Sequence, residues 1–194
     1  NNLQLMTVHA LQSVVFNRSL KKRLENGLSI TTPVTGDLVG RLDEKGQLAV
    51  SSCVTVEDRT APRIGRNCDL GRLTVTGPLP GQDIRTCEGK PGEFEQSVLE
   101  EMDLADTTWM VEAIPRLTTS GTRRSLTTSF SDFSVEVTPK AAEETLGERW
   151  NQGPGENSRW HPDGACLKFR FTLPSGSYAT ILLREYMRGP LNQL

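Results

Sequence analysis

Histidine and paired cysteine are scarce in this chain of 194 residues. Only His9 and His161 occur, so a histidine-based metal site would need both of them together with carboxylates. No two of the four cysteines form a Cys-x-x-Cys pair, which argues against a zinc site. The sequence also contains no glycine-rich phosphate-binding motif and no Gly-x-Ser-x-Gly motif, so the common nucleotide and hydrolase chemistries have no signature here.

Long apolar runs and a secretory leader are missing as well. No stretch approaches the roughly 18 apolar residues of a membrane span, and residues 1–4 do not open a basic and then apolar signal peptide. We therefore expect an intracellular protein, with cytoplasm, nucleus and mitochondrion all open. We expect its four cysteines to be reduced and mostly buried, although their number would also allow disulfides. The missing initiator Met indicates a processed product or a part of a longer protein.

The overall charge excludes a strongly basic, histone-like nucleic-acid binder, because the formal net charge is −2. The charges are nevertheless unevenly distributed. Residues 1–26 and 168–188 are both basic, whereas residues 88–106 carry seven acidic side chains against one lysine. Solvated faces without any partner would explain this pattern, and so would two basic surfaces that contact phosphates.

Hydrophobic periodicity and turn residues predict an α+β fold, a mixed sheet with flanking helices. An apolar stripe predicts a helix over residues 4–26 that ends at Gly27. We expect residues 57–72 to be irregular and Asp106 to cap a helix over 107–114. The remaining expected elements are a hairpin over 37–50, strands at 73–76, 133–137 and 166–173, and helices at 93–102 and 178–187. Residues 138–165 break the pattern and indicate an exposed insertion or a boundary.

Several segments resemble one enzyme family in their order and spacing. They read LQSVVFNR at 11–18, GDLV at 36–39, TGPLPG at 76–81, GTRR at 121–124 and LPSGSYATILLRE at 173–185. The TruD-type pseudouridine synthases carry similar segments at comparable places, and the last of these motifs is long and specific. The resemblance covers nearly the whole chain apart from residues 140–164.

The resemblance implies isomerisation of uridine to pseudouridine in RNA, without a cofactor. Family members place the reacting aspartate in a GxKDxxA segment, which this sequence lacks. By resemblance the chain comprises a TruD-type insertion domain (1–139), an exposed loop or insertion (140–164) and the last strand and helix of the catalytic domain (165–194). We therefore expect the catalytic Asp to lie upstream of this chain, in an N-terminal segment of the same protein, and the chain alone to be inactive.

Two other readings stay open. The chain could belong to a non-catalytic RNA-binding or ribonucleoprotein assembly factor that kept the TruD-type domain, or it could be a plain protein-interaction domain if the match is chance. The RNA partner could be tRNA, mRNA or rRNA. No membrane partner is expected.

Candidate site residues follow from the matching segments and from the basic regions. The resemblance suggests that Arg184 pairs with the catalytic Asp that is absent from this chain, although a structural salt bridge is the alternative. Tyr178 could stack on a base or belong to the core. The expected RNA-binding residues are Lys21, Lys22, Arg123, Arg124, Lys168, Arg170 and Tyr178. For Lys168 and Arg170 the alternative is a solvated strand face.

Overall fold

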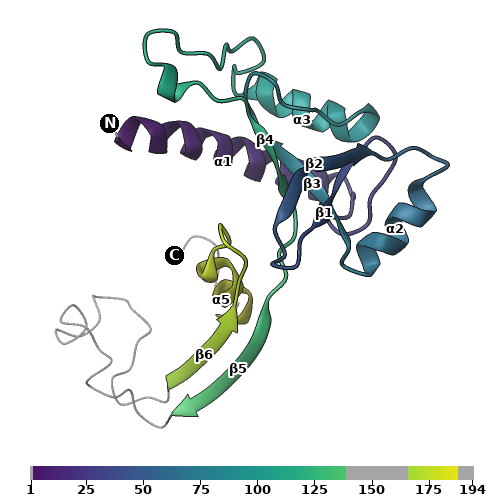
Figure 1. Cartoon of the computed structure of the whole chain (residues 1–194), viewed down its shortest axis with the longest axis vertical. Coiled ribbons are helices and arrows are strands. Elements are labelled where there is room, and N and C mark those ends of the chain that lie inside the picture. The colour runs from purple at the N-terminus through teal and green to yellow at the C-terminus, as the bar shows by residue number, and fades with distance from the viewer. Residues whose placement is uncertain (1, 139–165, 188–194) are drawn as a thin grey trace. The chain divides into compact units, whose positions relative to one another are not determined.

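The computed structural model describes residues 2–138 and 166–187, which form two compact units. Unit 1 runs to Thr128 and unit 2 begins at Ser129 (Figure 1). The α+β class with flanking helices is confirmed. The predicted division at residue 139 stays a prediction, and the predicted exposed loop over residues 140–164 lies outside the described residues.

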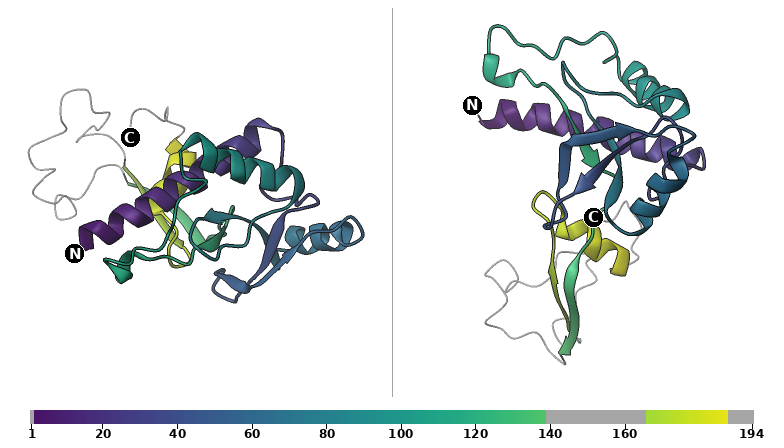
Figure 2. Two further views of the ribbon diagram at one scale, coloured as in Figure 1. Left: turned by 90° about the horizontal axis from the view of Figure 1, so that it is seen from above. Right: turned by 45° about the vertical axis from the view of Figure 1, so that its right-hand side comes forward.

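Unit 1 is built on a four-stranded sheet with the strand order β2-β1-β3-β4, in which every pair of neighbours is antiparallel. Helix α1 packs along β3 and beside α3 (Figure 2), whereas α2 packs against β3 through a separate cluster. Its elements are α1 (Asn2–Glu25), β1 (Leu38–Leu42), β2 (Leu48–Thr55), α2 (Ala61–Asp69), β3 (Leu73–Leu79), α3 (Gly89–Glu101), η1 (Pro115–Leu117) and β4 (Thr122–Ser125).

Local sequence signals explain where α1 ends and why β1 and β2 form a hairpin. Gly27 has a φ of 75° just after α1, and Leu28 N–H donates to the Arg23 carbonyl over 3.0 Å. This is the left-handed helix ending that glycine favours, as the sequence predicted. The hairpin of β1 and β2, with its turn at residues 43–46, is confirmed as well.

Residues 57–72 are not irregular throughout, because α2 lies within them. Pro62 lies in the first turn of α2, where its missing N–H costs nothing. Ile64 is buried in a cluster with Val39, Val56 and Val75. The prediction failed because Pro62 and Gly65 resemble helix breakers, while the apolar contact that stabilises α2 comes from the sheet.

The predicted helix over residues 107–114 is also wrong. This segment is a loop with a short turn at residues 112–113, and two of its backbone groups bond to residues after position 114. Thr119 N–H donates to the Trp109 carbonyl over 3.2 Å, and Val111 N–H donates to Thr118 Oγ1 over 2.9 Å. Helix α3 begins at Gly89 rather than at residue 93, because Pro91 is accommodated in its first turn.

Unit 2 is a hairpin of β5 (Ser131–Thr138) and β6 (Cys166–Thr172) with the helix α5 (Ala179–Met187). These elements confirm the strands and the helix expected in this part of the sequence. The Tyr186 ring of α5 stacks on Phe133 of β5 at 5.0 Å between ring centroids, and it lies 5.6 Å from the Phe169 ring of β6. An aromatic cluster therefore joins α5 to both strands.

Candidate nucleic-acid interface

The two lysines near the end of α1 are held differently. Lys21 is exposed and lies 3.7 Å from Glu25, one turn along the same helix. Lys22 forms an ion pair with Glu101 of α3 and so ties two helices together. Lys21 is therefore directed to solvent, while the ammonium of Lys22 already has a carboxylate partner.

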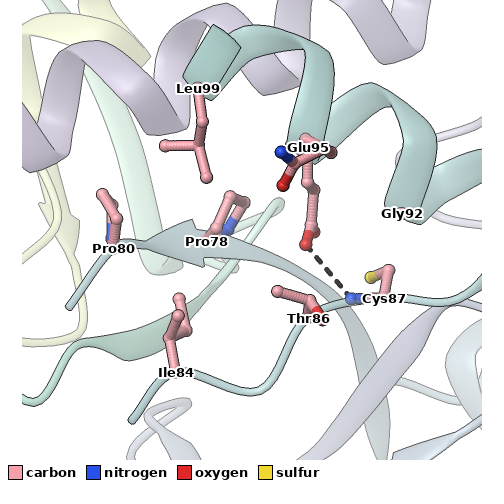
Figure 3. A pocket seen from close by; sticks show the side chains of 9 residues that line it. Pro78, Pro80, Ile84, Thr86, Cys87, Gly92, Glu95 and Leu99 are labelled. Carbon is pink, nitrogen blue, oxygen red and sulfur yellow. Dashed lines mark hydrogen bonds between the residues drawn. The ribbon is translucent and has the colours of Figure 1, made fainter. Parts of the chain in front are cut away.

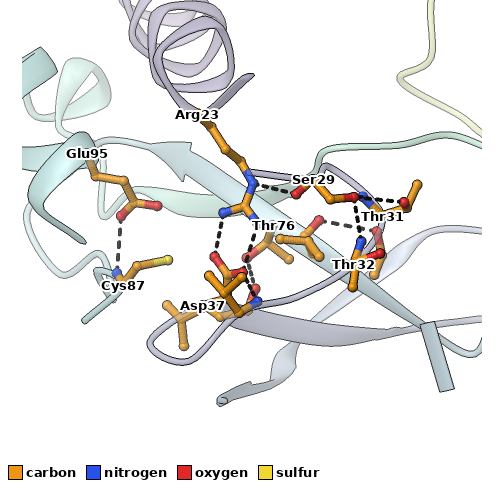
Figure 4. Close-up of polar contacts among 12 residues, drawn as sticks. Arg23, Ser29, Thr31, Thr32, Asp37, Thr76, Cys87 and Glu95 are labelled. Atoms are coloured by element: carbon orange, nitrogen blue, oxygen red, sulfur yellow. Dashed lines mark hydrogen bonds and ion pairs between the residues drawn. The ribbon is translucent and has the colours of Figure 1, made fainter. Parts of the chain in front are cut away.

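Arg23, the next residue, points into the protein. Its guanidinium makes two parallel hydrogen bonds to Asp37, at 2.6 and 2.8 Å, and its Nε donates to the Ser29 carbonyl at 2.7 Å (Figure 4). Asp37 is fully buried and also accepts the N–H of Val34 at 2.7 Å. This network joins α1 to the loop before β1, so the Gly36-Asp37 motif has a structural role in this chain.

Arg123 differs from the sequence-based expectation of an RNA contact. It is 4% exposed, and its guanidinium pairs with both carboxylate oxygens of Glu95, at 2.7 and 2.9 Å. Its Nε donates to Thr76 Oγ1 and its Nη2 to the sulfur of Cys87. Because each guanidinium nitrogen is bonded inside unit 1, Arg123 is not presented to a phosphate outside it.

The thiol and the guanidinium in this network have shifted pKa values. Burial raises the pKa of the Cys87 thiol to about 12, and the charge of Glu95 adds to the effect, whereas Arg123 opposes it. Burial alone lowers the pKa of Arg123, but the hydrogen bond and charge of Glu95 outweigh burial and raise it. The Cys87 thiol is therefore neutral near pH 7 and is a poor nucleophile.

A cavity of about 230 Å³ lies beside this network. Figure 3 shows Pro78, Pro80, Ile84 and Leu99 around it, with Cys87 and Glu95 at one side. Two of its polar groups bond each other, since Cys87 N–H donates to Glu95 Oε2 at 3.1 Å. The cavity therefore offers an apolar wall but no activated acid, base or nucleophile.

Among the described residues, no group of three or more His, Cys, Asp or Glu side chains is placed to hold a metal ion. Cys53, Cys68 and Cys87 are free thiols; the first and last are buried and Cys68 is half-buried. The expected burial is confirmed for Cys53 and Cys87, and the expected reduced state stays a prediction.

Arg124 is placed on the side of β4 opposite to Arg123, as strand alternation requires. It is half-buried, with its guanidinium 5.6 Å from the centre of the Phe16 ring of α1. This cation–π contact positions the side chain and leaves part of it at the surface.

Lys168 and Arg170 share one exposed face of β6. Their partners in the register on β5 are Glu136 and Ser134, and Lys168 Nζ lies 3.9 Å from Glu136 Oε2. Both of these charged side chains are about two-thirds exposed, so solvent screens the pair. The structure therefore brings Lys168 and Arg170 together on one face that includes one carboxylate.

Tyr178 lies just before the first residue of α5, and Arg184 lies in the second turn of this helix. Tyr178 is 63% exposed, so it is not a core residue of the described part of the chain. Arg184 is 30% exposed, and its Nη2 lies 3.9 Å from Glu185 Oε1. Gly176, in the turn before α5, has a φ of 82°, a left-handed conformation that glycine adopts at no steric cost.

The TGPLPG motif has a packing role. An added Cβ on Gly81 would lie 1.9 Å from the Gly121 nitrogen, and one on Gly77 would lie 2.9 Å from a Phe16 ring carbon. Gln12, from the first motif, donates to the Pro80 carbonyl at 2.8 Å. These segments therefore hold the strands, the loops and α1 at close approach.

Sequence reasoning missed a set of exposed arginines around α2. The charge pattern drew attention to the two basic ends and the acidic segment 88–106, and residues 57–72 were expected to be irregular, so no helix face was expected there. The spacing of Arg63 and Arg66, three residues apart, is the signal that would have found them. The four residues are Arg41, Arg63, Arg66 and Arg72.

The sequence and fold of this chain match those of known proteins of one family. The model of the family described as tRNA pseudouridine synthase D (TruD) matches residues 1–186. Proteins named as tRNA pseudouridine synthase D from Methanosarcina acetivorans and Methanosarcina mazei are 34% and 36% identical over 187 and 189 residues, which is 96% of this chain in both cases. The chain spans only 38% of the length of these two relatives.

A solved structure shows the same fold. The crystal structure of the M. mazei protein assigned as tRNA pseudouridine synthase D superposes with a TM-score of 0.76 at 31% identity, covering all of this chain and 40% of that protein. No helix among the described residues has the length and apolar character to cross a bilayer. With a family model that covers almost the full length and a matching fold, the chain belongs to the tRNA pseudouridine synthase D family.

Proposed function

We propose that this chain is part of an RNA pseudouridine synthase that isomerises uridine in tRNA, with the nucleophilic aspartate supplied by a segment outside this chain. The observation that carries the proposal is the family match over residues 1–186 of a chain that spans 38% of its relatives' length. The isomerisation detaches the uracil and rejoins it through carbon, so it consumes no second substrate. No cofactor is needed for this chemistry.

The exposed hairpin of unit 2 supports the idea that further chain covers it. Val137, Leu167 and Ile181 are 67%, 57% and 51% exposed, and a hairpin of two strands is marginally stable by itself in water. We infer that β6 and α5 belong to a larger catalytic domain, which buries this apolar surface with segments from outside this chain.

Arg184 is proposed to be the partner of the catalytic aspartate. Its guanidinium contacts only the exposed Glu185 carboxylate within the described part of the chain, at the long distance of 3.9 Å. A planar guanidinium offers two parallel donors to a carboxylate. An arginine in that position would stabilise the ionised form of the aspartate and lower its pKa.

Phosphate binding is proposed for the exposed cations Lys21, Lys168 and Arg170 and for the half-buried Arg124. The ammonium of Lys22 would have to leave Glu101 to join them. Tyr178, with its large exposed surface, is proposed to stack on a base of the bound RNA, because aromatic side chains commonly stack on unpaired bases.

A pseudouridine assay on two preparations tests this function. The full-length protein, incubated with an unmodified tRNA transcript, is expected to form pseudouridine without any added cofactor. The purified chain of residues 1–194 is expected to form none, because it lacks the aspartate segment. Turnover by the chain alone would contradict the placement of the nucleophile. A full-length protein that binds tRNA but never modifies it would instead favour a non-catalytic assembly factor.

A further inference from the structure

Helix α2 presents arginines on the side that faces away from its core contacts. Ile64 is buried, with Ala61 and Cys68 packed against the same cluster. Arg63 and Arg66 lie one turn apart on the opposite side of the helix, and both are exposed. Because α2 packs on the sheet through the side that carries Ile64, the side chains of Arg63 and Arg66 point to solvent.

Two more arginines lie near this helix, Arg72 through a backbone bond to α2 and Arg41 through the pairing of β1 with β3. Arg72 N–H donates to the Asn67 carbonyl of α2 at 3.0 Å, and the Arg72 carbonyl accepts the Leu42 N–H at 3.2 Å. Arg41 of β1 is paired with Leu73 of β3, and both Arg41 and Arg72 are exposed. We call Arg41, Arg63, Arg66 and Arg72 the α2 arginine face.

The α2 arginine face has little acidic compensation. Residues 59–72, which hold Arg59 and three members of the face, contain no lysine and only one acidic residue, Asp69, whereas Asp43 and Glu44 follow Arg41 in the sequence. In the described part of the chain, none of the four members of the face forms an ion pair, whereas nearby Arg59 bonds Glu57 at 2.6 Å. The negative end of the α2 dipole explains Arg66, which is in the last turn, but it does not explain the other three.

We propose that the α2 arginine face binds the phosphate backbone of the RNA substrate, in addition to the contacts proposed for Lys168 and Arg170. The inference rests on the proposed function. Its partner follows from the chemistry: unpaired guanidinium groups offer planar donor pairs that match phosphate oxygens. Phosphate contacts of this kind position RNA without reading its sequence. The face therefore contributes affinity and orientation rather than choice of the target uridine.

The test measures the affinity of the full-length protein for an unmodified tRNA transcript across a salt series. The variant is R63Q/R66Q, which removes two charges from the face and leaves Ile64 and the core intact. Loss of two phosphate contacts is expected to reduce the slope of log affinity against log salt by roughly 1.4 to 1.8. This corresponds to an affinity about 25- to 60-fold lower near 0.1 M salt.

Two control variants make the result specific. K90Q/R116Q removes the same charge from exposed positions on α3 and η1 and is expected to leave slope and affinity nearly unchanged. R63K/R66K keeps the charge and loses the planar fork, so most of the salt dependence is expected to remain. Circular dichroism and thermal melting of each variant confirm that α2 is still folded, since a melted variant would lose binding for a different reason.

Three results would overturn the inference. If wild-type protein binds tRNA and R63Q/R66Q binds it equally well with the same slope, the α2 arginine face does not contact RNA, while the proposed function stands. If R63Q/R66Q loses binding to polyglutamate but keeps its affinity for tRNA, the face serves an acidic protein. If the wild-type protein binds no tRNA, the proposed function fails and this inference fails with it.

Discussion

The interior of unit 1 and the surface of unit 2 use arginine in opposite ways. In unit 1, Arg23 and Arg123 are buried and each makes two hydrogen bonds to one carboxylate. In unit 2, Arg170 is exposed, and Arg184 has one distant carboxylate neighbour. A buried pair costs much to break, because it leaves an unpaired charge, whereas an exposed pair contributes little. An arginine within a family motif is therefore no evidence of substrate contact by itself. Whether its side chain is buried or exposed determines whether it is available to bind a substrate.

The largest expected effect is on the buried pair of Arg123. Arg123→Ala leaves Glu95 buried without its cation and is expected to lower the free energy of unfolding by about 3–5 kcal/mol. Arg124→Ala, one residue along on β4, removes a cation–π contact of a half-buried side chain and is expected to cost about 1 kcal/mol. Urea denaturation of the chain measures both. Equal costs for the two variants would contradict the structural role given to Arg123.

A second prediction concerns the rate in the full-length enzyme. If Arg184 pairs with the catalytic aspartate, Arg184→Ala is expected to lower the single-turnover rate about a hundredfold, which corresponds to roughly 2.7 kcal/mol in the barrier. Arg184→Lys keeps the charge without the planar fork and is expected to lose less. The melting temperature should stay close to that of the parent in both variants. A lower melting temperature with an unchanged single-turnover rate would make Arg184 a structural residue.

A third prediction follows from the raised pKa of Cys87 and concerns alkaline pH. The pKa of the Cys87 thiol is near its ordinary value of 9.0 in the unfolded chain, whereas burial raises it to about 12 in the folded chain. Above pH 9 the unfolded state therefore binds fewer protons than the folded state, and stability falls as pH rises. The loss attributable to this thiol is roughly 1.4 kcal/mol per pH unit between pH 9 and 12.

Cys87→Ala isolates this contribution. Urea titrations at pH 8, 9, 10 and 11 are expected to show a shallower alkaline loss in the variant than in the parent chain, although the variant starts from a lower stability because it leaves a small cavity. Identical pH profiles would mean that Cys87 ionises alike in the folded and unfolded states.

The smallest expected effect on stability is at the exposed face of β6. The double variant K168Q/R170Q is expected to change the free energy of unfolding by about 0.5 kcal/mol or less, because surface substitutions of this kind rarely do more. In the full-length protein it is expected to reduce the salt slope of tRNA binding by roughly 1.4 for two lost contacts. An unchanged slope would leave the two side chains as a solvated strand face.

Features that depend on nearby residues could be predicted from the sequence. The end of α1 at Gly27 and the first hairpin depend on turn chemistry within a few positions. By contrast, α2 depends on Ile64 meeting Val39 and Val75 from other strands, and the loop at 107–114 depends on bonds to residues 118 and 119. Partners outside a segment leave no signal in the sequence of that segment, so the predictions for residues 57–72 and 107–114 were wrong.

For the candidate site, the sequence indicated the family and the exposed cations of unit 2, but it treated Arg123 and Arg124 as equivalent. Strand alternation alone implies that two neighbouring residues of β4 lie on opposite faces. With one face of the sheet buried, only one of the two could be presented to RNA. Which of them is buried depends on Glu95, 28 positions away in the sequence.

The register of β5 and β6 has a practical consequence for protein engineering. Thr138 and Cys166 are paired as direct partners across the hairpin, so the polypeptide leaves one strand and enters the other at the same end. A longer connection between such points adds only about 0.6 kcal/mol of closure entropy for each doubling in length. A fluorescent domain or an affinity tag inserted between the two strands is therefore expected to leave their pairing intact.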